Sequence, residues 1–289
     1  MTDDILEELD LDDLIEDDTT KAESSATIRQ SKLLDSLSLA STLSTEKRAT
    51  KREQGLRTLF KAMTQYATGA AGQEIIQSRL EEVILPICFN GLRGGTSPAE
   101  QYASCRVLEA TSILLGGNND DYAEQVCDKL VRVVKMTQRA GQVRGAALRA
   151  LAMAFFICAT DVDSSDVVLN LCEQVCAPEF RNEAVPPNLR ATALDCWALL
   201  STTIHNAYLA GSDIPGSGDG RGLVILPLLS DCLNSTNLDL RCAAGECVAL
   251  IHEARLELGI DDEQGENASE RRYRRGEFFF HFIGKGGTI

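Results

Sequence analysis

Apolar residues recur at helical spacing through the middle of the chain, and three stretches follow one template. The stretches open at Val143-Arg144, Leu189-Arg190 and Leu240-Arg241, which lie 46 and 51 residues apart. With each leading aliphatic residue counted as position 0, small or apolar side chains fill positions +3, +4, +7, +8 and +11 in all three copies. These positions form one stripe along a helix of 3.6 residues per turn. The pattern therefore predicts three equivalent amphipathic helices, which we call template helices.

A repeat of this length is typical of stacked helix pairs. HEAT and armadillo arrays repeat every 40–47 residues or so and are helical. Small residues in the first turn of each template helix allow a neighbouring helix to approach closely. Stacked units bury each other's apolar stripes and leave an extended surface exposed. We therefore predict an all-α, armadillo/HEAT-like α-solenoid over residues 28–258, which binds partners rather than enclosing a reaction site.

Further helices are expected around the three clear copies. A degenerate fourth copy follows Ser97-Pro98-Ala99-Glu100, in which Ser97 can cap the helix, Pro98 suits its first turn and Glu100 completes a capping box. The clear template helices are expected at residues 142–160, 187–209 and 238–258. Linking helices are expected at residues 75–92, 120–138, 165–177 and 223–234. Pro86 should bend or divide the first linking helix.

The negative charge is concentrated at the N-terminus. Residues 1–18 hold ten acids and no base, whereas the remainder has 33 acids and 28 bases. Such a composition predicts a disordered acidic tail over residues 1–27. Among the acids stand the apolar residues Ile5, Leu6, Leu9 and Leu14. They predict an amphipathic segment that binds a partner, and the alternative is a solvated tail that only aids solubility.

A second tail, polar and disordered, is expected over residues 259–289. It contains the densest basic run of the chain, Arg271-Arg272-Tyr273-Arg274-Arg275. Four guanidinium groups around an aromatic ring can hold phosphates and stack on a base, or serve as a nuclear import signal. The alternative is that the run only balances nearby acids.

The positions of the cysteines and the N-terminal sequence indicate the cellular compartment of the protein. Eight of the ten cysteines fall inside apolar helical runs, where they behave as small hydrophobic residues. This usage indicates a reducing compartment. The first residues lack the features of a signal peptide or a mitochondrial presequence. The longest apolar run, residues 150–159, is too short to span a bilayer. We expect a protein of the cytoplasm and nucleus that is not inserted in a membrane.

No pattern in the sequence supports catalysis. The three histidines lack metal-ligand spacing. The alternating glycines of residues 216–222 lack the preceding strand and the lysine of a phosphate-binding loop. We therefore expect no enzyme activity, no cofactor, no metal and no small-molecule substrate.

An arginine follows the leading aliphatic residue in every clear copy, at Arg144, Arg190 and Arg241. In stacked repeats such an arginine usually pairs with an acid or carbonyl of a neighbouring unit, so we predict that these residues stabilise the stack. The alternative is a ladder of positive charge for an acidic peptide or an RNA backbone. Trp197 fills position +8, where a buried stacking role is expected.

Two segments carry a resemblance to the interferon-related developmental regulator family over roughly residues 30–255. They are Cys-Trp-Ala-Leu-Leu-Ser-Thr at residues 196–202 and Leu-Arg-Cys-Ala-Ala-Gly-Glu-Cys-Val-Ala-Leu at residues 240–250. Lys47-Arg48, followed by residues 52–56, fits the family's first helix. The resemblance implies an armadillo-like region that regulates without catalysis.

Family members resemble transcriptional co-regulators that act through repressor and deacetylase complexes, and a related member is implicated in ribosome binding and translational silencing. The resemblance thus implies a non-enzymatic adaptor for regulatory protein complexes in transcription. The alternative is a ribosome-associated translation regulator that contacts rRNA or ribosomal proteins. The family usually continues into a separate C-terminal region, so roles that depend on that region are in doubt for this sequence.

Overall fold

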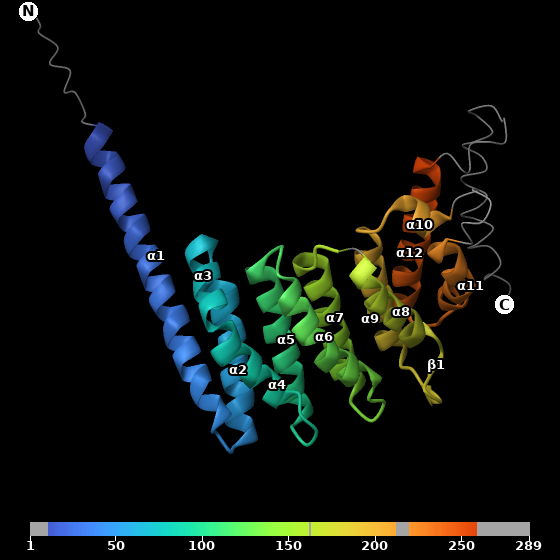
Figure 1. Ribbon diagram of the computed structural model, residues 1–289, viewed down its shortest axis with the longest axis horizontal. Coiled ribbons are helices and arrows are strands. Elements are labelled where there is room, and N and C mark those ends of the chain that lie inside the picture. Colours follow the sequence, from blue (N-terminus) through green and yellow to red (C-terminus); the bar gives the residue numbers. More distant parts are fainter. Residues whose placement is uncertain (1–10, 162, 212–219, 259–289) are drawn as a thin grey trace, which may run out of the picture.

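A computed structural model describes residues 11–161, 163–211 and 220–258, and these residues are almost entirely helical. The helices stand side by side along the long axis of the molecule, from α1 at one end to α12 and α11 at the other (Figure 1). The elements are α1 (Leu11–Ser41), η1 (Thr42–Ser44), α2 (Ala49–Tyr66), α3 (Gly69–Arg79), η2 (Leu80–Ile84), α4 (Leu85–Gly91), α5 (Pro98–Leu115), α6 (Asp120–Lys135), α7 (Gly141–Cys158), η3 (Asp163–Ser165), α8 (Asp166–Cys176), β1 (Glu179–Phe180), β2 (Glu183–Ala184), α9 (Pro187–Ser201), α10 (Asn206–Ala210), α11 (Arg221–Leu233) and α12 (Leu238–Glu257).

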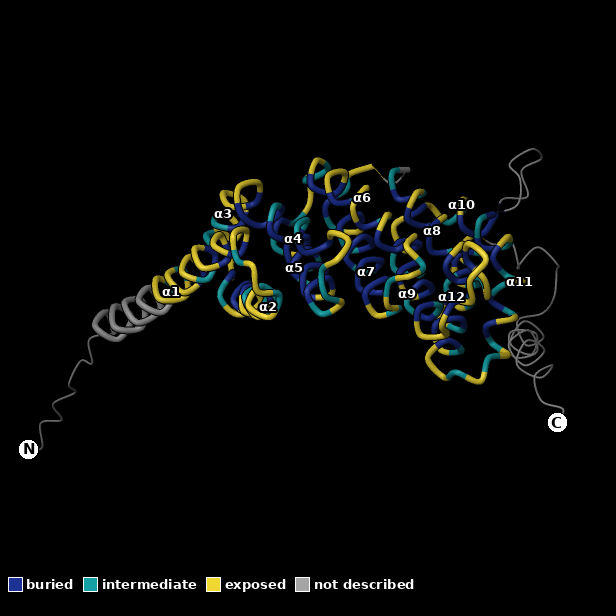
Figure 2. Tube along the Cα trace, turned by 90° about the horizontal axis from the view of Figure 1, so that it is seen from below, coloured by how far each residue is buried: buried dark blue, intermediate teal, exposed yellow. Residues whose placement is uncertain are grey.

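The template helices α5, α7, α9 and α12 pack successively against one another, and α2 packs against α5. Linking helices cover them in pairs, α6 against α7, α8 against α9 and α11 against α12. The predicted stripe is buried in each clear copy apart from Thr192 and Val248, which are partly exposed. Buried residues therefore run through the middle of the row of helices, and exposed residues lie on its outer surfaces (Figure 2).

The helix expected at residues 187–209 is divided in two. α9 ends at Ser201, and α10 begins at Asn206. The hydroxyl groups of Thr202 and Thr203 each donate to a carbonyl three residues earlier, at 2.7 Å, which competes with continued helix. His205 then caps α10, since its Nδ1 accepts a hydrogen bond from the amide of Ala207 at 3.1 Å.

The first linking helix is interrupted close to the place that Pro86 predicted. The chain forms α3, one π-helical turn at Leu80–Ile84, and then α4 with Pro86 in its first turn. Proline has no amide hydrogen and its ring crowds the carbonyl four residues earlier. The widened π-helical turn accommodates this defect before regular α-helix resumes.

Strands were not expected, but a small antiparallel hairpin joins α8 to α9. β1 pairs with β2 in the register Glu179 to Ala184 and Phe180 to Glu183. The two residues between them, Arg181 and Asn182, have φ values of 56° and 64°. Positive φ at both central residues is the requirement of a type I′ hairpin turn, and asparagine tolerates it well.

The N-terminal helix begins earlier than the composition predicted. α1 starts at Leu11, so residues 11–27, which we expected within a disordered tail, are helical in the structure. Acid-rich composition argues for disorder, but the alanine, lysine and glutamate of this stretch are also strong helix formers. Further along α1, Leu33, Leu37 and Ala40 are buried where the helix packs against α2.

Two helical glycines should respond to alanine in opposite ways. A Cβ at Gly245, in the middle of α12, would meet no atom within 4 Å. A Cβ at Gly222 in α11 would lie 2.7 Å from Cγ1 of Ile251 and 2.8 Å from the carbonyl oxygen of Leu209. We expect Gly245→Ala to raise the free energy of unfolding by about 0.5–1 kcal/mol. Gly222→Ala should lower it by about 1–3 kcal/mol. Urea denaturation followed by circular dichroism measures both, and equal effects would contradict this packing.

Candidate protein-interaction surface

The three recurrent arginines bond to the turn that precedes each template helix. Each guanidinium donates to a main-chain carbonyl at or just beyond the C-terminal end of the preceding linking helix. The pairs are Arg144 Nε to Val134 O at 2.9 Å, Arg190 Nε to Cys176 O at 2.6 Å and Arg241 Nη1 to Ser235 O at 2.9 Å. Carbonyls at a helix C-terminus lack intrahelical partners and carry partial negative charge. The arginines therefore satisfy the turns within helix pairs, and the buried Arg144 cannot belong to an exposed ladder of charge.

The degenerate copy, α5, has Gln101 at the arginine position, and an arginine from elsewhere occupies the equivalent place. Arg139, between α6 and α7, donates from Nη2 to the carbonyl of Leu92 at the end of α4, at 2.8 Å. Its Nη1 donates to Oε1 of Gln101 at 2.9 Å. Arg139 was not predicted to take the role of a template arginine, because it lies outside the template. The only signal was the missing arginine in α5.

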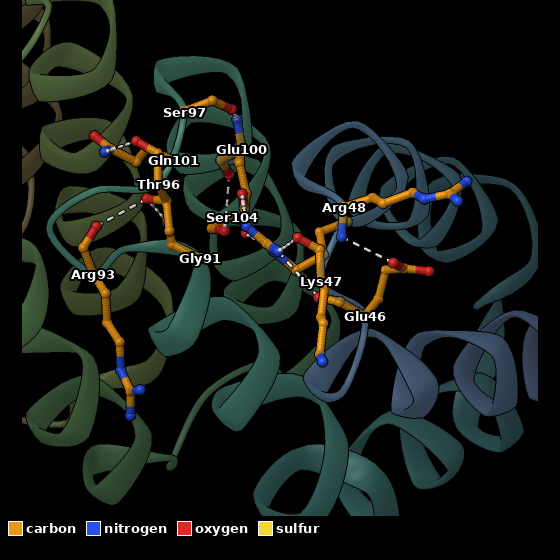
Figure 3. Close-up of polar contacts among 11 residues, drawn as sticks. Glu46, Lys47, Arg48, Gly91, Arg93, Thr96, Ser97, Glu100, Gln101 and Ser104 are labelled. Atoms are coloured by element: carbon orange, nitrogen blue, oxygen red, sulfur yellow. Dashed lines mark hydrogen bonds and ion pairs between the residues drawn. The ribbon is translucent and has the colours of Figure 1, made fainter.

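Glu100 has a different role from the one its capping-box position suggested. Ser97 caps α5 as expected, because its Oγ accepts from the amide of Glu100 at 3.1 Å. The buried carboxylate of Glu100, however, accepts two hydrogen bonds from Arg52 of α2, at 2.7 and 2.9 Å. Arg52 also donates to the carbonyls of Glu46 and Lys47, at 3.0 Å each. Figure 3 shows these surroundings of Glu100, in which a charged pair joins α2 to α5.

A second polar network joins three helices around Trp197. The indole is fully buried in α9, and its Nε1 donates to Oε1 of Glu173 in α8 at 3.0 Å. Arg221 of α11 donates to the same oxygen from Nε at 2.7 Å. Its Nη1 bonds to Asp166 at 3.0 Å. Trp197 thus combines apolar burial with a hydrogen bond that helps to hold α8, α9 and α11 together.

The side of the template helices opposite the buried stripe carries several exposed or partly exposed residues. In each copy this side corresponds to positions +2, +6, +9 and +13, which point within about one-sixth of a turn of each other. We call the residues at these positions that are at least partly exposed the ridge face. They are Tyr102, Arg106, Glu109 and Ile113 on α5, Arg149 and Phe156 on α7, Asp195 and Ala198 on α9 with Thr202 at its C-terminal cap, and Cys242, Glu246, Ala249 and Glu253 on α12.

The chemistry of the ridge face changes from one end to the other. At position +13 the residues read Ile113, Phe156, Thr202 and Glu253 from α5 to α12, and the first two side chains are 54% and 37% exposed. At position +6 they read Arg106, Arg149, Asp195 and Glu246. The α5–α7 end therefore carries two large apolar side chains and two arginines, of which Arg106 forms an ion pair with Glu109 at 2.7 Å, whereas the α9–α12 end is acidic.

The pKa of Asp195 depends on charged side chains of the neighbouring template helices. Partial burial raises its pKa, and the like charges of Glu246 and Asp239 on α12 raise it further. Arg149 on α7 acts in the opposite direction and lowers the pKa. The charged groups of three successive template helices therefore interact, so a partner bound here would meet them as one surface.

Sequence analysis placed partner binding in the tails, and most of those residues lie outside the described part of the chain. The residues concerned are Ile5, Leu6, Leu9, Arg271, Arg272, Tyr273, Arg274 and Arg275. Leu14 lies within α1. The ridge face was not identified from the sequence, although large apolar residues on the solvent side of two template helices were an available signal.

Three further features concern metal ligands, Cys242 and the apolar helix α7. Within residues 11–161, 163–211 and 220–258, no group of three or more histidine, cysteine, aspartate or glutamate side chains is placed to hold a metal ion. Cys242 is exposed, contrary to the expected apolar role, because position +2 faces away from the stripe. Among the described residues, α7 is the one helix long and apolar enough to cross a membrane, and 67% of it is buried within the fold.

The comparison with protein families covers almost the whole chain. The model of the interferon-related developmental regulator family matches residues 5–278, which include every helix described above. No curated protein sequence matches significantly. A match over nearly the full length, together with the helical fold, shows that the chain belongs to the interferon-related developmental regulator family.

Proposed function

We propose that the chain is a non-enzymatic regulatory adaptor, an armadillo/HEAT-like α-solenoid whose ridge face binds protein partners in transcriptional co-regulation. The observation that supports this most directly is the pair of exposed apolar residues, Ile113 and Phe156, at equivalent positions of neighbouring template helices. Large apolar groups that remain exposed together on a folded surface typically mark interaction sites.

The proposed partner has a chemistry that complements both ends of the ridge face. Its apolar side chains would contact Ile113 and Phe156, which supply the central contacts of the complex. Basic groups further along the partner would meet Asp195, Glu246 and Glu253. Complementary charge of this kind contributes to association rate and orientation more than to affinity.

The proposed setting is the nucleus and the cytoplasm, with regulatory protein complexes as partners. Family membership supports a regulatory role, and the row of helices supplies an extended surface rather than an enclosed reaction site. The protein's influence on transcription would then depend on which complex the ridge face recruits.

A tethered reporter tests the proposal. The full chain, fused to a DNA-binding module, is expected to change transcription of a reporter by severalfold. The double variant Ile113→Glu/Phe156→Glu should lose most of this effect, because loss of two central contacts weakens binding by about tenfold or more.

Val167→Glu is the matched control, since Val167 on α8 is 55% exposed against 54% for Ile113 and is not part of the ridge face. It should retain the full effect. Equal loss in both variants would contradict the proposal. An inactive reporter combined with co-sedimentation of the chain with ribosomes at physiological salt would instead support the translational alternative.

A further inference from the structure

Two cysteines far apart in the sequence meet at the ends of two linking helices. Cys176 is the last residue of α8, and Cys232 lies in the last turn of α11. Their Sγ atoms are 3.7 Å apart, and both side chains are fully buried. Both cysteines contact Arg190 near the start of α9, and neither belongs to the ridge face.

Arg190 connects the two cysteines. Its Nη2 donates to Sγ of Cys232 at 3.2 Å, and its Nε donates to the carbonyl of Cys176 at 2.6 Å. A guanidinium in contact with sulfur stabilises the thiolate, which is the nucleophilic form of cysteine. The other two template arginines donate to main-chain carbonyls, Arg144 to that of Val134 and Arg241 to those of Ser235 and Thr236.

The environment makes the two sulfur atoms chemically different. The hydrogen bond shared with Cys176 and the charge of Arg190 lower the pKa of Cys232, against the opposing effect of burial. The pKa of Cys176 is raised, because its thiol shares a hydrogen bond with Cys232 and is desolvated. Elsewhere in the same core, burial raises the pKa of Cys196 to about 12. Cys232 is thus suited to be the attacking thiolate and Cys176 the second thiol.

We propose that Cys176 and Cys232 form an oxidation site, at which a hydroperoxide converts the thiol pair into a disulfide that joins α8 to α11. The thiolate of Cys232 attacks one peroxide oxygen, the O–O bond breaks, and the sulfur becomes a sulfenic acid while hydroxide leaves. The sulfur of Cys176 then attacks the sulfenic sulfur. Its proton and the departing hydroxyl group leave as water. In total, two thiols and one hydrogen peroxide give one disulfide and two waters.

The geometry requires only a small movement. A disulfide has an S–S length of about 2.05 Å, so the sulfur atoms must approach by roughly 1.6 Å from their separation of 3.7 Å. Side-chain rotation can supply much of this. The disulfide would close a loop between residues that are 56 apart in sequence, which restricts the unfolded chain. Oxidised protein should therefore melt several degrees higher than reduced protein.

Peroxide titration of the reduced full chain tests the proposal. Stoichiometric hydrogen peroxide should yield a product two mass units lighter, with the peptides of Cys176 and Cys232 joined and then released by reductant. Cys176→Ser should accumulate sulfenic acid at Cys232, which dimedone traps. Cys232→Ser should give neither product.

The arginine contact has its own test. Arg190→Gln should slow disulfide formation by about tenfold, since the thiolate fraction falls when its guanidinium partner is lost. Arg241→Gln changes the same template position, where the guanidinium donates to the carbonyls of Ser235 and Thr236, and should react at the original rate.

Circular dichroism and melting of every reduced variant identify any that fail to fold. If a variant fails, cross-link mapping in the unmodified chain still decides. Oxidation confined to the exposed Cys242, or cross-links between other cysteines, would overturn the proposal.

Discussion

Replacing Trp197 with alanine is expected to lower the free energy of unfolding by about 3–5 kcal/mol, the range measured for removal of large buried aromatic residues. The indole is fully buried between template and linking helices. Its removal leaves a cavity and also removes the hydrogen bond from Nε1 to Glu173 at 3.0 Å. Urea denaturation followed by far-UV circular dichroism is the appropriate measurement, because Trp197 is the only tryptophan and its fluorescence is lost in the variant.

Trp197→Phe separates packing from the hydrogen bond. Phenylalanine keeps an aromatic ring in the site but cannot donate to Glu173, which retains its contact with Arg221 at 2.7 Å. The cost should fall to about 1–2 kcal/mol, the scale of one lost hydrogen bond and a small cavity. If Trp197→Ala lowers the free energy of unfolding by less than about 1 kcal/mol, the buried stripe is not the main stabilising part of the core.

Replacing Arg52 with methionine should cost about 3 kcal/mol, because it leaves a buried carboxylate without its partner. Glu100 is only 1% exposed and receives both of its short hydrogen bonds from Arg52. The guanidinium also satisfies two carbonyls between η1 and α2, so those bonds are lost as well. Chemical denaturation at neutral pH measures the difference in unfolding free energy.

Two controls identify the cause. The double variant Arg52→Met/Glu100→Met should recover much of the loss, because no uncompensated charge remains. Arg57→Met, on the same helix, removes a pair with Glu53 whose arginine side chain is 66% exposed. Exposed pairs contribute about 0–1 kcal/mol, so this variant should be close to neutral. Similar costs for Arg52→Met and Arg57→Met would contradict the role of burial.

The part of the fold that was predictable is the part governed by periodicity. The stripe that contains Ala147, Trp197 and Ala244 is buried as predicted, because each position repeats at the period of the helix. The break between α9 and α10 was missed, since Thr202 and Thr203 act there through hydroxyl bonds that compete locally with the helix.

Contacts that depend on three-dimensional proximity were beyond the sequence pattern. Arg52 and Glu100 are 48 residues apart, and Cys176 and Cys232 are 56 apart. Nothing in local spacing indicates that either pair meets. We predicted that each template arginine pairs with an acid or a carbonyl of a neighbouring unit. Arg144, Arg190 and Arg241 all bond to carbonyls at or just beyond the end of the preceding linking helix.

The candidate surface was missed for a different reason. The template was defined by the buried positions +3, +4, +7, +8 and +11. Ile113 and Phe156 occupy position +13, on the side of the helix opposite that stripe. Once the stripe is known, apolar residues on the other side become informative, because solvent-facing positions rarely carry such side chains in neighbouring units.

Site-specific photo-crosslinking tests the central claim most directly, namely that the ridge face is where this chain binds its protein partner. A photoreactive phenylalanine analogue is placed at Ile113 or Phe156, and in a matched protein at Val167 of α8, which is as exposed as Ile113. We predict that both ridge positions cross-link the same protein in cells and that position 167 does not. Cross-links from position 167 alone, or none from either ridge position while the partner still co-purifies, would contradict the account.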